Sequence, residues 1–227
     1  VGEGYHSRAG HPHAEVEALR QAGNKARSAD LYVNLEPCCH FGRTPPCTDA
    51  IIQAGIKRVF VGMKDPNKQV SGKGLRALKA QGIVIVSGIL KKECMKLNES
   101  FVKVMQTGMP FVIMKTAMSL DGKIATRSGD ARWISGELAR KHVHKIRNYV
   151  DAILVGTETV LKDNPRLTCR LATGSVEHPI RIILDRRNRI PLTANVFKNS
   201  RSQPVIYVTG PDISPARQKA LVARKVE

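Results

Sequence analysis

Short apolar runs alternate with helical segments in the first half of this chain, and this alternation restricts the fold more than any other feature. The apolar runs predict strands at residues 31–36, 59–62 and 83–86. The segments between them predict helices at 12–22, near 47–54, and from the glycine-rich turn at 71–74 to residue 80. Strands that alternate with helices form βαβ units around a largely parallel sheet. The pattern therefore predicts an α/β fold.

The same rhythm restarts after Gly108, Met109 and Pro110, which mark a candidate domain boundary. The second half predicts strands at 111–116, 152–155, 180–184 and 205–208, and a helix at 136–149 with Leu138, His142, Ile146 and Tyr149 near one face. The length of 227 residues suits two modest domains, because a domain has roughly 150 residues. We therefore expect domains at residues 1–108 and 109–227.

The composition narrows the classes of partner. No apolar run approaches the roughly 20 residues that span a membrane, so no membrane partner is expected. The net charge of +18 is spread over both halves, and it either solvates the surface or attracts nucleic acid, nucleotides or phosphorylated metabolites. Aromatic residues make up only 4% of the chain, which leaves few stacking platforms for single-stranded nucleic acid. We expect a small phosphorylated molecule, and not a nucleic acid, as the partner.

The cysteines point to a metal site. Three of the five, Cys38, Cys39 and Cys47, fall within ten residues, and the total is odd. Such a cluster suits a metal site in a reducing compartment better than a disulfide framework. We therefore expect a cytoplasmic protein.

One motif has the composition of a catalytic zinc site. The pattern H-x-E followed by P-C and a further cysteine is a signature of zinc nucleobase deaminases, and here it falls on His13, Glu15, Pro37, Cys38 and Cys47. His13 and Glu15 would point about 200° apart in mid-helix, but both can reach one point from a helix start. Cys47 also begins a predicted helix, whose dipole favours a thiolate. We predict His13, Cys38 and Cys47 as ligands of Zn²⁺ and Glu15 as the group that carries a proton from water to the leaving ammonia.

Two alternatives remain open at this point. Cys39 and His40 compete for the metal, and either one as a fourth protein ligand would make the zinc structural, in a non-catalytic zinc-stabilised scaffold. Cys38 is preferred because it directly follows Pro37. The other alternative is a nucleic-acid base deaminase, which the basic charge favours and the eight residues between Cys38 and Cys47 oppose.

The sequence HAEV at 13–16 with EPCCHFGRTPPC at 36–47 resembles the deaminase domain of the bifunctional riboflavin-biosynthesis deaminase-reductases. The resemblance implies a three-layer, cytidine-deaminase-like domain that acts on a diaminopyrimidinone carrying a ribosylamino 5′-phosphate. It also implies that His6, Arg43, Asp65 and Asn67 line the substrate pocket, with Arg43 near the phosphate. The family has a helix and a strand in front of the position of Val1, so we expect the N-terminal part of this domain to be missing.

Motifs in the second half resemble the reductase domain of the same enzymes: Lys115, SLDGKIA at 119–125, GDARWIS at 129–135 and DNPRLTCR at 163–170. The resemblance implies a dihydrofolate-reductase-like domain that reduces the ribosyl group to a ribityl chain with NADPH. The implied cofactor positions are Ala117, Trp133, Thr159 and Asp163. The implied substrate positions are Lys115, Ala131, Ser135, Arg147, Asn164, Leu167 and Arg170, and the two arginines suit a phosphate. We also expect a homo-oligomer, and a missing C-terminal part after Glu227.

Overall fold

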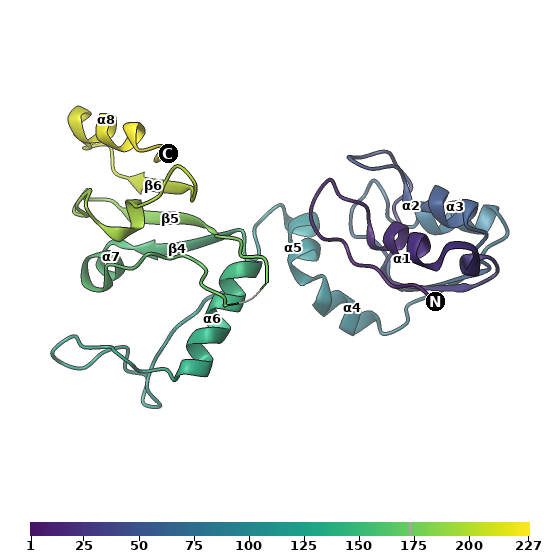
Figure 1. Cartoon of the computed structure of the whole chain (residues 1–227), viewed down its shortest axis with the longest axis horizontal. Coiled ribbons are helices and arrows are strands. Elements are labelled where there is room, and N and C mark those ends of the chain that lie inside the picture. Colours follow the sequence, from purple (N-terminus) through teal and green to yellow (C-terminus); the bar gives the residue numbers. More distant parts are fainter. Residues whose placement is uncertain (173) are drawn as a thin grey trace. The chain divides into compact units, whose positions relative to one another are not determined.

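The computed structural model describes residues 1–172 and 174–227 and divides the chain into two compact units, Val1–Met114 and Lys115–Glu227 (Figure 1). Each unit has its own three-stranded parallel sheet and its own buried apolar cluster. The predicted α/β class with parallel strands is confirmed.

The sheet of the first unit has the strand order β1-β2-β3. Its strands are β1 (Asp30–Leu35), β2 (Arg58–Met63) and β3 (Val84–Ser87). Its helical segments are α1 (Ala14–Ala22), η1 (Gly23–Ala26), α2 (Cys47–Gln53), α3 (Lys73–Ala80), α4 (Lys91–Leu97) and α5 (Glu99–Thr107). Helices α2 and α3 are the crossover connections that allow neighbouring strands to run parallel. The predicted strands and helices of this unit are therefore confirmed to within a few residues.

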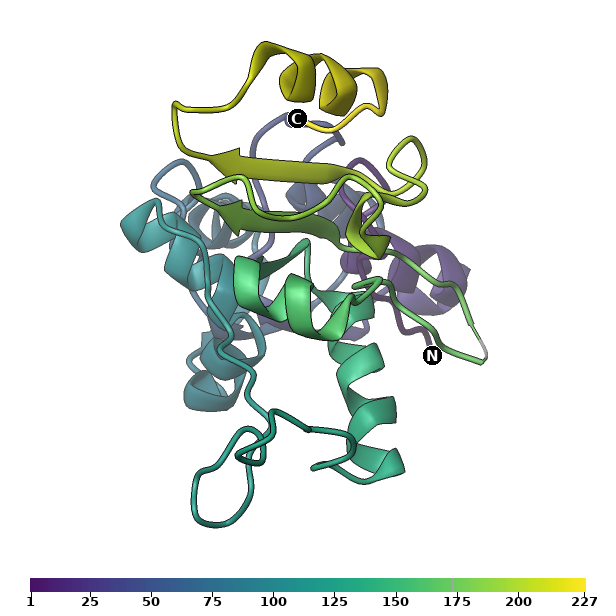
Figure 2. The same ribbon diagram turned by 90° about the vertical axis from the view of Figure 1, so that its left-hand side faces the viewer.

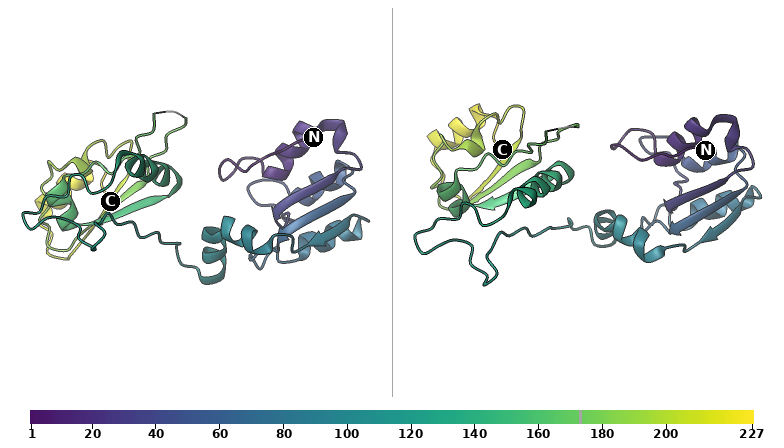
Figure 3. Two further views of the ribbon diagram at one scale, coloured as in Figure 1. Left: turned by 90° about the horizontal axis from the view of Figure 1, so that it is seen from below. Right: turned by 60° about the horizontal axis from the view of Figure 1, so that its bottom comes forward.

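Helices cover both faces of this sheet, which makes three layers (Figure 3). On one face, Val59 and Val61 of β2 pack with Ile51 of α2 and Leu78 of α3, and all four side chains are fully buried. On the other face, α4 passes so close to Gly62 that a Cβ atom there would lie 2.2 Å from Cys94 Sγ. Only glycine therefore fits at this point of β2.

The second unit has the strand order β4-β5-β6. Its elements are α6 (Glu137–Tyr149), β4 (Ala152–Gly156), α7 (Thr157–Asp163), β5 (Ile180–Asp185), η2 (Asn195–Phe197), β6 (Val205–Thr209) and α8 (Pro215–Ala223). The free edge of β6 is extended by the last residues, where Glu227 N donates to Val205 O (3.0 Å) and Tyr207 N donates to Glu227 O (2.6 Å). The carboxyl ends of the three strands meet at one edge, which is where ligands bind in open α/β sheets.

The core of the second unit lies on one face of its sheet. Ile183 of β5 and Tyr207 of β6 pack with Val160 of α7, Phe197 of η2 and Leu221 of α8. In Figure 2, α7 (green) lies beside the strands and α8 (yellow) lies beyond β6. On the opposite face Leu154, Leu184 and Val208 occupy neighbouring strands and stay exposed.

One sequence prediction for the second unit is wrong. Residues 111–116 are not a strand: Val112 and Met114 are 78% and 87% exposed, and no described strand pairs with the segment. An apolar, β-branched run becomes a strand only where a neighbour satisfies its backbone N–H and C=O groups. The predicted helix at 136–149 is confirmed as α6, and two of the residues near its predicted face, Leu138 (83%) and Tyr149 (74%), are exposed. No helix among the described residues has the length and apolar content needed to cross a membrane.

Candidate active sites

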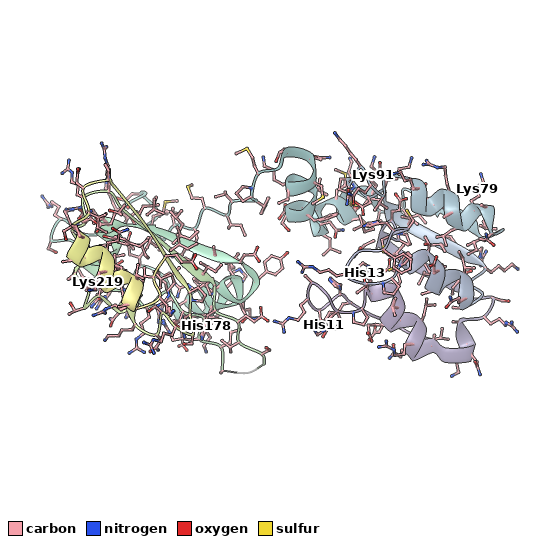
Figure 4. All side chains as sticks on the ribbon, turned by 90° about the horizontal axis from the view of Figure 1, so that it is seen from above. His11, His13, Lys79, Lys91, His178 and Lys219 are labelled. Carbon is pink, nitrogen blue, oxygen red and sulfur yellow. The ribbon has the colours of Figure 1, made fainter. Side chains whose placement is uncertain are left out.

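The predicted metal ligands of the first unit come together. His13 is the N-cap residue of α1, Cys38 lies three residues beyond β1, and Cys47 is the first residue of α2. His13 Nδ1 lies 3.2 Å from Cys47 Sγ and 3.5 Å from Cys38 Sγ, and one donor atom of each residue lies within 4.8 Å of the others. Figure 4 labels His13 on the first unit. Three converging donors of the His-Cys-Cys type match a zinc site.

The first turn of α2 holds Cys38 in place. Cys47 N donates to Cys38 Sγ (3.3 Å), and Thr48 N donates to Cys38 O (3.1 Å). A hydrogen bond from the Cys47 thiol lowers the pKa of Cys38 to about 5. The pKa of Cys47 is raised, because its thiol is hydrogen-bonded to Cys38, is buried, and lies beside the Glu15 carboxylate. A divalent cation stabilises both thiolates, so the donor set fits zinc.

Glu15 faces the same centre. It lies in the first turn of α1, near the Cys47 thiol, whose pKa its charge helps to raise. Burial raises the pKa of Glu15, and the Cys38 thiolate raises it further. A carboxyl group beside the metal ligands with a raised pKa is suited to accept a proton and to give it back.

Thr44 and His6 contact the ring of His13. Thr44 Oγ1 lies 3.4 Å from His13 Nε2, and the His6 ring meets the His13 ring edge to face with 4.9 Å between centroids. If His13 Nε2–H donates to Thr44, its Nδ1 lone pair is free for a metal. Such a partner fixes the tautomer of a ligand histidine. The motif comparison did not single out Thr44, although it lies in the loop between the two cysteines.

The described residues offer three protein ligands at this point, not four. Cys39 and His40, the competing residues, are outside the cluster that His13, Cys38 and Cys47 form. Three protein ligands leave the fourth position of zinc for water, as in catalytic sites. The geometry therefore argues against a purely structural zinc.

The predicted substrate residues of the first unit are brought together only in part. Asp65 is 7% exposed, and its Oδ1 accepts a hydrogen bond from Asn67 N (2.8 Å). Burial raises the pKa of Asp65, and the nearby charges of Glu36 and Cys38 raise it further. His6 contacts His13 directly. Arg43 is exposed on the loop between the cysteines, and none of the described hydrogen bonds joins its side chain to the others.

In the second unit, two of the predicted substrate residues form a basic cluster. Arg147 Nη1 donates to Thr168 O (3.1 Å), and Arg170 Nη1 donates to Thr168 Oγ1 (3.4 Å). Burial lowers the pKa of Arg147, and the charge of Arg170 lowers it further. Arg147 Nε is buried without a partner among the described residues. Two guanidinium groups that no described carboxylate neutralises suit an anion such as a phosphate.

The loop that carries Arg170 is held by one polar face of α6. His144 Nδ1 accepts from Arg170 N (3.1 Å), and Asn148 Oδ1 accepts from Glu177 N (2.7 Å). The pKa of His144 is lowered by burial and by the charges of Arg147 and Arg170, so its ring stays a neutral acceptor. The spacing of positions 144, 147 and 148 puts these side chains on one helix face, which is a signal the sequence analysis missed.

The remaining predicted residues of the second unit are more dispersed. Asp163 is the last residue of α7, and Asn164 and Leu167 lie in the segment after it. Asn164 O accepts from the Asn195 side chain (2.9 Å), and Asn164 Oδ1 accepts from Asn195 N (2.8 Å). Trp133 is 72% exposed, and the guanidinium carbon of Arg140 lies over its ring, 4.5 Å from the ring centroid. Five further residues have no described side-chain hydrogen bond into this segment: Lys115, Ala117, Ala131, Ser135 and Thr159.

A unit with a zinc-type His-Cys-Cys site, followed by a separate parallel α/β unit, defines a two-domain α/β class of metal-binding protein. Two family models match in this order: the cytidine and deoxycytidylate deaminase zinc-binding region at residues 1–63, and the RibD C-terminal domain at residues 110–227. The chain belongs to the RibD family. Its fold is therefore a deaminase-like domain followed by a dihydrofolate-reductase-like domain, as predicted.

Individual relatives agree with the family models. The chain is 50% identical over 209 residues to the riboflavin biosynthesis protein RibD of Aquifex aeolicus, covering 92% of this chain and 58% of the relative. It is 48% identical over 201 residues to RibD of Escherichia coli, covering 84% and 55%. The chain thus spans somewhat more than half the length of these curated relatives.

Solved structures extend the likeness to the whole chain. Acinetobacter baumannii RibD, form 1, superposes with a TM-score of 0.87 at 45% identity, covering 100% of this chain and 62% of that one. A Thermotoga maritima protein superposes with a TM-score of 0.84 at 40% identity, covering 100% and 68%. The latter is described as a diaminohydroxyphosphoribosylaminopyrimidine deaminase and 5-amino-6-(5-phosphoribosylamino)uracil reductase.

Proposed function

We propose that this chain carries out two successive steps of riboflavin biosynthesis. The first unit removes an amino group from 2,5-diamino-6-(ribosylamino)pyrimidinone 5′-phosphate by hydrolysis, and the second reduces the ribosyl group of the product to a ribityl chain with NADPH. The observation that carries the proposal is the convergence of His13, Cys38 and Cys47 with the Glu15 carboxylate. The order of the two family matches supports the pairing of a deaminase with a reductase.

In the deaminase step, His13, Cys38 and Cys47 would hold zinc, which when bound lowers the pKa of a water molecule to about 7. Glu15 takes a proton from the water and delivers it to the amino group that leaves. The ring carbon gains the oxygen of the water, its bond to nitrogen breaks, and ammonia and a uracil-type ring result. His6, Asp65 and Asn67 are proposed to orient the pyrimidine, and Arg43 to bind the phosphate.

In the reductase step, Arg147 and Arg170 are proposed to bind the substrate phosphate. Lys115 is proposed to polarise a sugar oxygen of the ring-opened substrate, and NADPH, when bound, would supply the hydride that reduces C1. Ala131, Ser135, Asn164 and Leu167 are the further proposed substrate contacts. Ala117, Trp133, Thr159 and Asp163 are the proposed cofactor contacts.

Two properties of the protein as a whole are also proposed. All five cysteines are free in the structure, which supports a reducing compartment such as the cytoplasm. The exposed apolar side chains Leu154, Leu184 and Val208 on one sheet face support association into a homo-oligomer.

The function is tested by assaying the zinc-loaded chain for ammonia release from the diaminopyrimidinone phosphate and for NADPH oxidation with the deaminated product. Both reactions are expected. Base deamination in RNA, with no release from the pyrimidine phosphate, would instead identify a nucleic-acid editor. Bound zinc without any deamination would identify a scaffold.

Replacing Arg147 or Arg170 by methionine is expected to raise KM of the reductase step roughly 10- to 100-fold, because each removes charge-assisted hydrogen bonds to the phosphate. The same variants should reduce the dephosphorylated substrate no worse than the unmodified chain does. Lys141→Met is the matched control, since Lys141 is exposed on the same helix and pairs only with Glu137. Equal losses with both substrates would mean that the arginines do not bind the phosphate.

A further inference from the structure

Glu36 is a buried carboxylate for which the proposed reaction has no use. It directly follows β1, two residues before Cys38, and it is 3% exposed. Its backbone N–H donates to Met63 O (3.0 Å), which continues the pairing of β1 with β2. The strand pair therefore fixes where its side chain starts.

Three backbone N–H groups from one distant segment converge on this carboxylate. Oε2 accepts from Asp65 N (3.2 Å) and Gly72 N (2.8 Å), and Oε1 accepts from Leu75 N (3.2 Å). No charged side chain supplies these bonds. The carboxylate is thus satisfied by the segment between β2 and α3 and by the first turn of α3, where a negative charge also suits the helix dipole.

The start of α3 lies too close to Glu36 and Pro37 for any side chain at Gly74. A Cβ atom at Gly74 would lie 2.1 Å from Pro37 O and 3.3 Å from Glu36 Oε1. Gly72, the N-cap of α3, has φ +82°, a left-handed conformation that glycine adopts without strain. Both glycines allow the start of α3 to rest on Glu36 and Pro37.

The same carboxylate closes the loop that carries Asp65 and Asn67. Asp65 N and Gly72 N, the two ends of this loop, both donate to Oε2. Inside the loop, Asp65 Oδ1 accepts from Asn67 N (2.8 Å), and Asn67 O accepts from Val70 N (2.9 Å) and Ser71 N (3.0 Å). Only one residue, Pro37, separates Glu36 from Cys38. One side chain therefore joins the loop of the proposed substrate residues to the strand end of a proposed metal ligand.

We propose that Glu36 is a positioning residue of the deaminase site, which sets Asp65 and Asn67 at their distance from Cys38. This inference rests on the proposed deaminase function. Glu36 lies outside the cluster of donor atoms, is buried, and acts through the backbone of the loop. Its loss displaces the groups that bind the pyrimidine, while Glu15 and the ligand set keep their places.

Glu36→Gln is the first test. The amide keeps the shape but offers one oxygen and one NH₂ group to three N–H donors, so at least one donor loses its partner. KM for the diaminopyrimidinone phosphate should rise about tenfold or more, with zinc content unchanged. The kcat value should stay within about threefold, because binding is lost equally in the ground state and the transition state.

Glu36→Asp and a double-variant cycle with Asp65→Asn separate positioning from general stability. The shorter aspartate keeps the charge but cannot reach both oxygen positions, so an intermediate KM is expected. If Glu36 acts through the loop of Asp65 and Asn67, the double variant Glu36→Gln, Asp65→Asn should raise KM by clearly less than the product of the two single effects. Should Glu36→Gln fail to fold, Glu36→Asp in the same cycle gives the same comparison.

Asp185→Asn is the matched control. Asp185 is fully buried in the second unit and accepts from Ile190 N (2.8 Å) and Tyr207 Oη (2.7 Å). The amide of the Asp185→Asn variant loses a comparable set of hydrogen bonds, and KM of the deaminase step should not change. An unchanged KM in both Glu36 variants, or additive effects in the cycle, overturns the inference. A fall in kcat or zinc content at unchanged KM overturns it too, because Glu36 would then serve the metal site. An unmodified chain that neither binds nor deaminates the pyrimidine refutes the proposed function itself.

Discussion

Glu15→Gln is expected to lower kcat of deamination at least about 10³-fold while the chain keeps its zinc, because a positioned acid-base group contributes roughly 10²- to 10⁴-fold and here one residue serves both transfers. Glu15 acts on the water proton and on the leaving amine, so its amide can neither accept the first proton nor donate it in the second step. The carboxylate is not one of the three clustered donors, and zinc binding should therefore survive. Ammonia release and metal analysis on the same preparation measure both quantities.

Glu17→Gln is the matched control for this experiment. Glu17 lies on the same helix two residues further on, and its carboxylate pairs with Arg20 (2.8 Å) near the surface. Such exposed pairs contribute little to stability, so the variant should deaminate like the unmodified chain. Substantial deamination by Glu15→Gln would show that another group moves the proton, and zinc loss in this variant would make Glu15 a ligand.

The sequence predicted most of the first unit because its local signals agree with its tertiary contacts. Apolar residues of β1 and β2 belong to the buried cluster with the helices. Gly23 and Gly55 follow the ends of α1 and α2 with positive φ angles, which glycine adopts without strain. The two short helices α4 and α5 were not predicted. Neither has more than one buried residue, so few tertiary contacts accompany them.

In the second unit, local sequence patterns do not predict the tertiary contacts. Residues 111–116 have the composition of a strand, but pairing depends on a neighbour that the segment itself does not specify. Helix α6 was predicted correctly, although the contacts that hold the Arg170 loop come from its polar positions 144, 147 and 148. An analysis of apolar periodicity does not reveal a helix face that makes its contacts by hydrogen bonds.

For the metal site, motif spacing identified the three clustered residues, but it gave no geometric reason to prefer Cys38 over the adjacent Cys39. Cys38 was preferred over Cys39 only from its place after Pro37, whereas the structure shows the first turn of α2 donating to Cys38 Sγ. Thr44 and Glu36 stand in the motif but received no role, because their partners are 29 to 39 residues away along the chain. Such contacts depend on the packing of loops, which no local pattern encodes.

The choice between these two cysteines leads to the prediction with the other large effect. Cys38→Ser is expected to weaken zinc binding by more than the 10- to 100-fold that typically follows loss of a ligand's hydrogen-bond partner, and to abolish deamination with it. A serine hydroxyl stays protonated at neutral pH, whereas the Cys38 thiol, with its pKa lowered to about 5, supplies a thiolate. Titration of zinc against a competing chelator measures the affinity.

Cys39→Ser makes the same chemical change one residue away and should keep both zinc affinity and deamination. Cys39 is partly exposed and lies outside the cluster of donor atoms, so its thiol contributes no ligand in the described arrangement. If Cys39→Ser lost zinc and Cys38→Ser kept it, Cys39 and not Cys38 would be the ligand. Loss in both variants would mean that four protein ligands surround the metal. Since a zinc with four protein ligands keeps no position for water, that result would favour a structural site over a catalytic one.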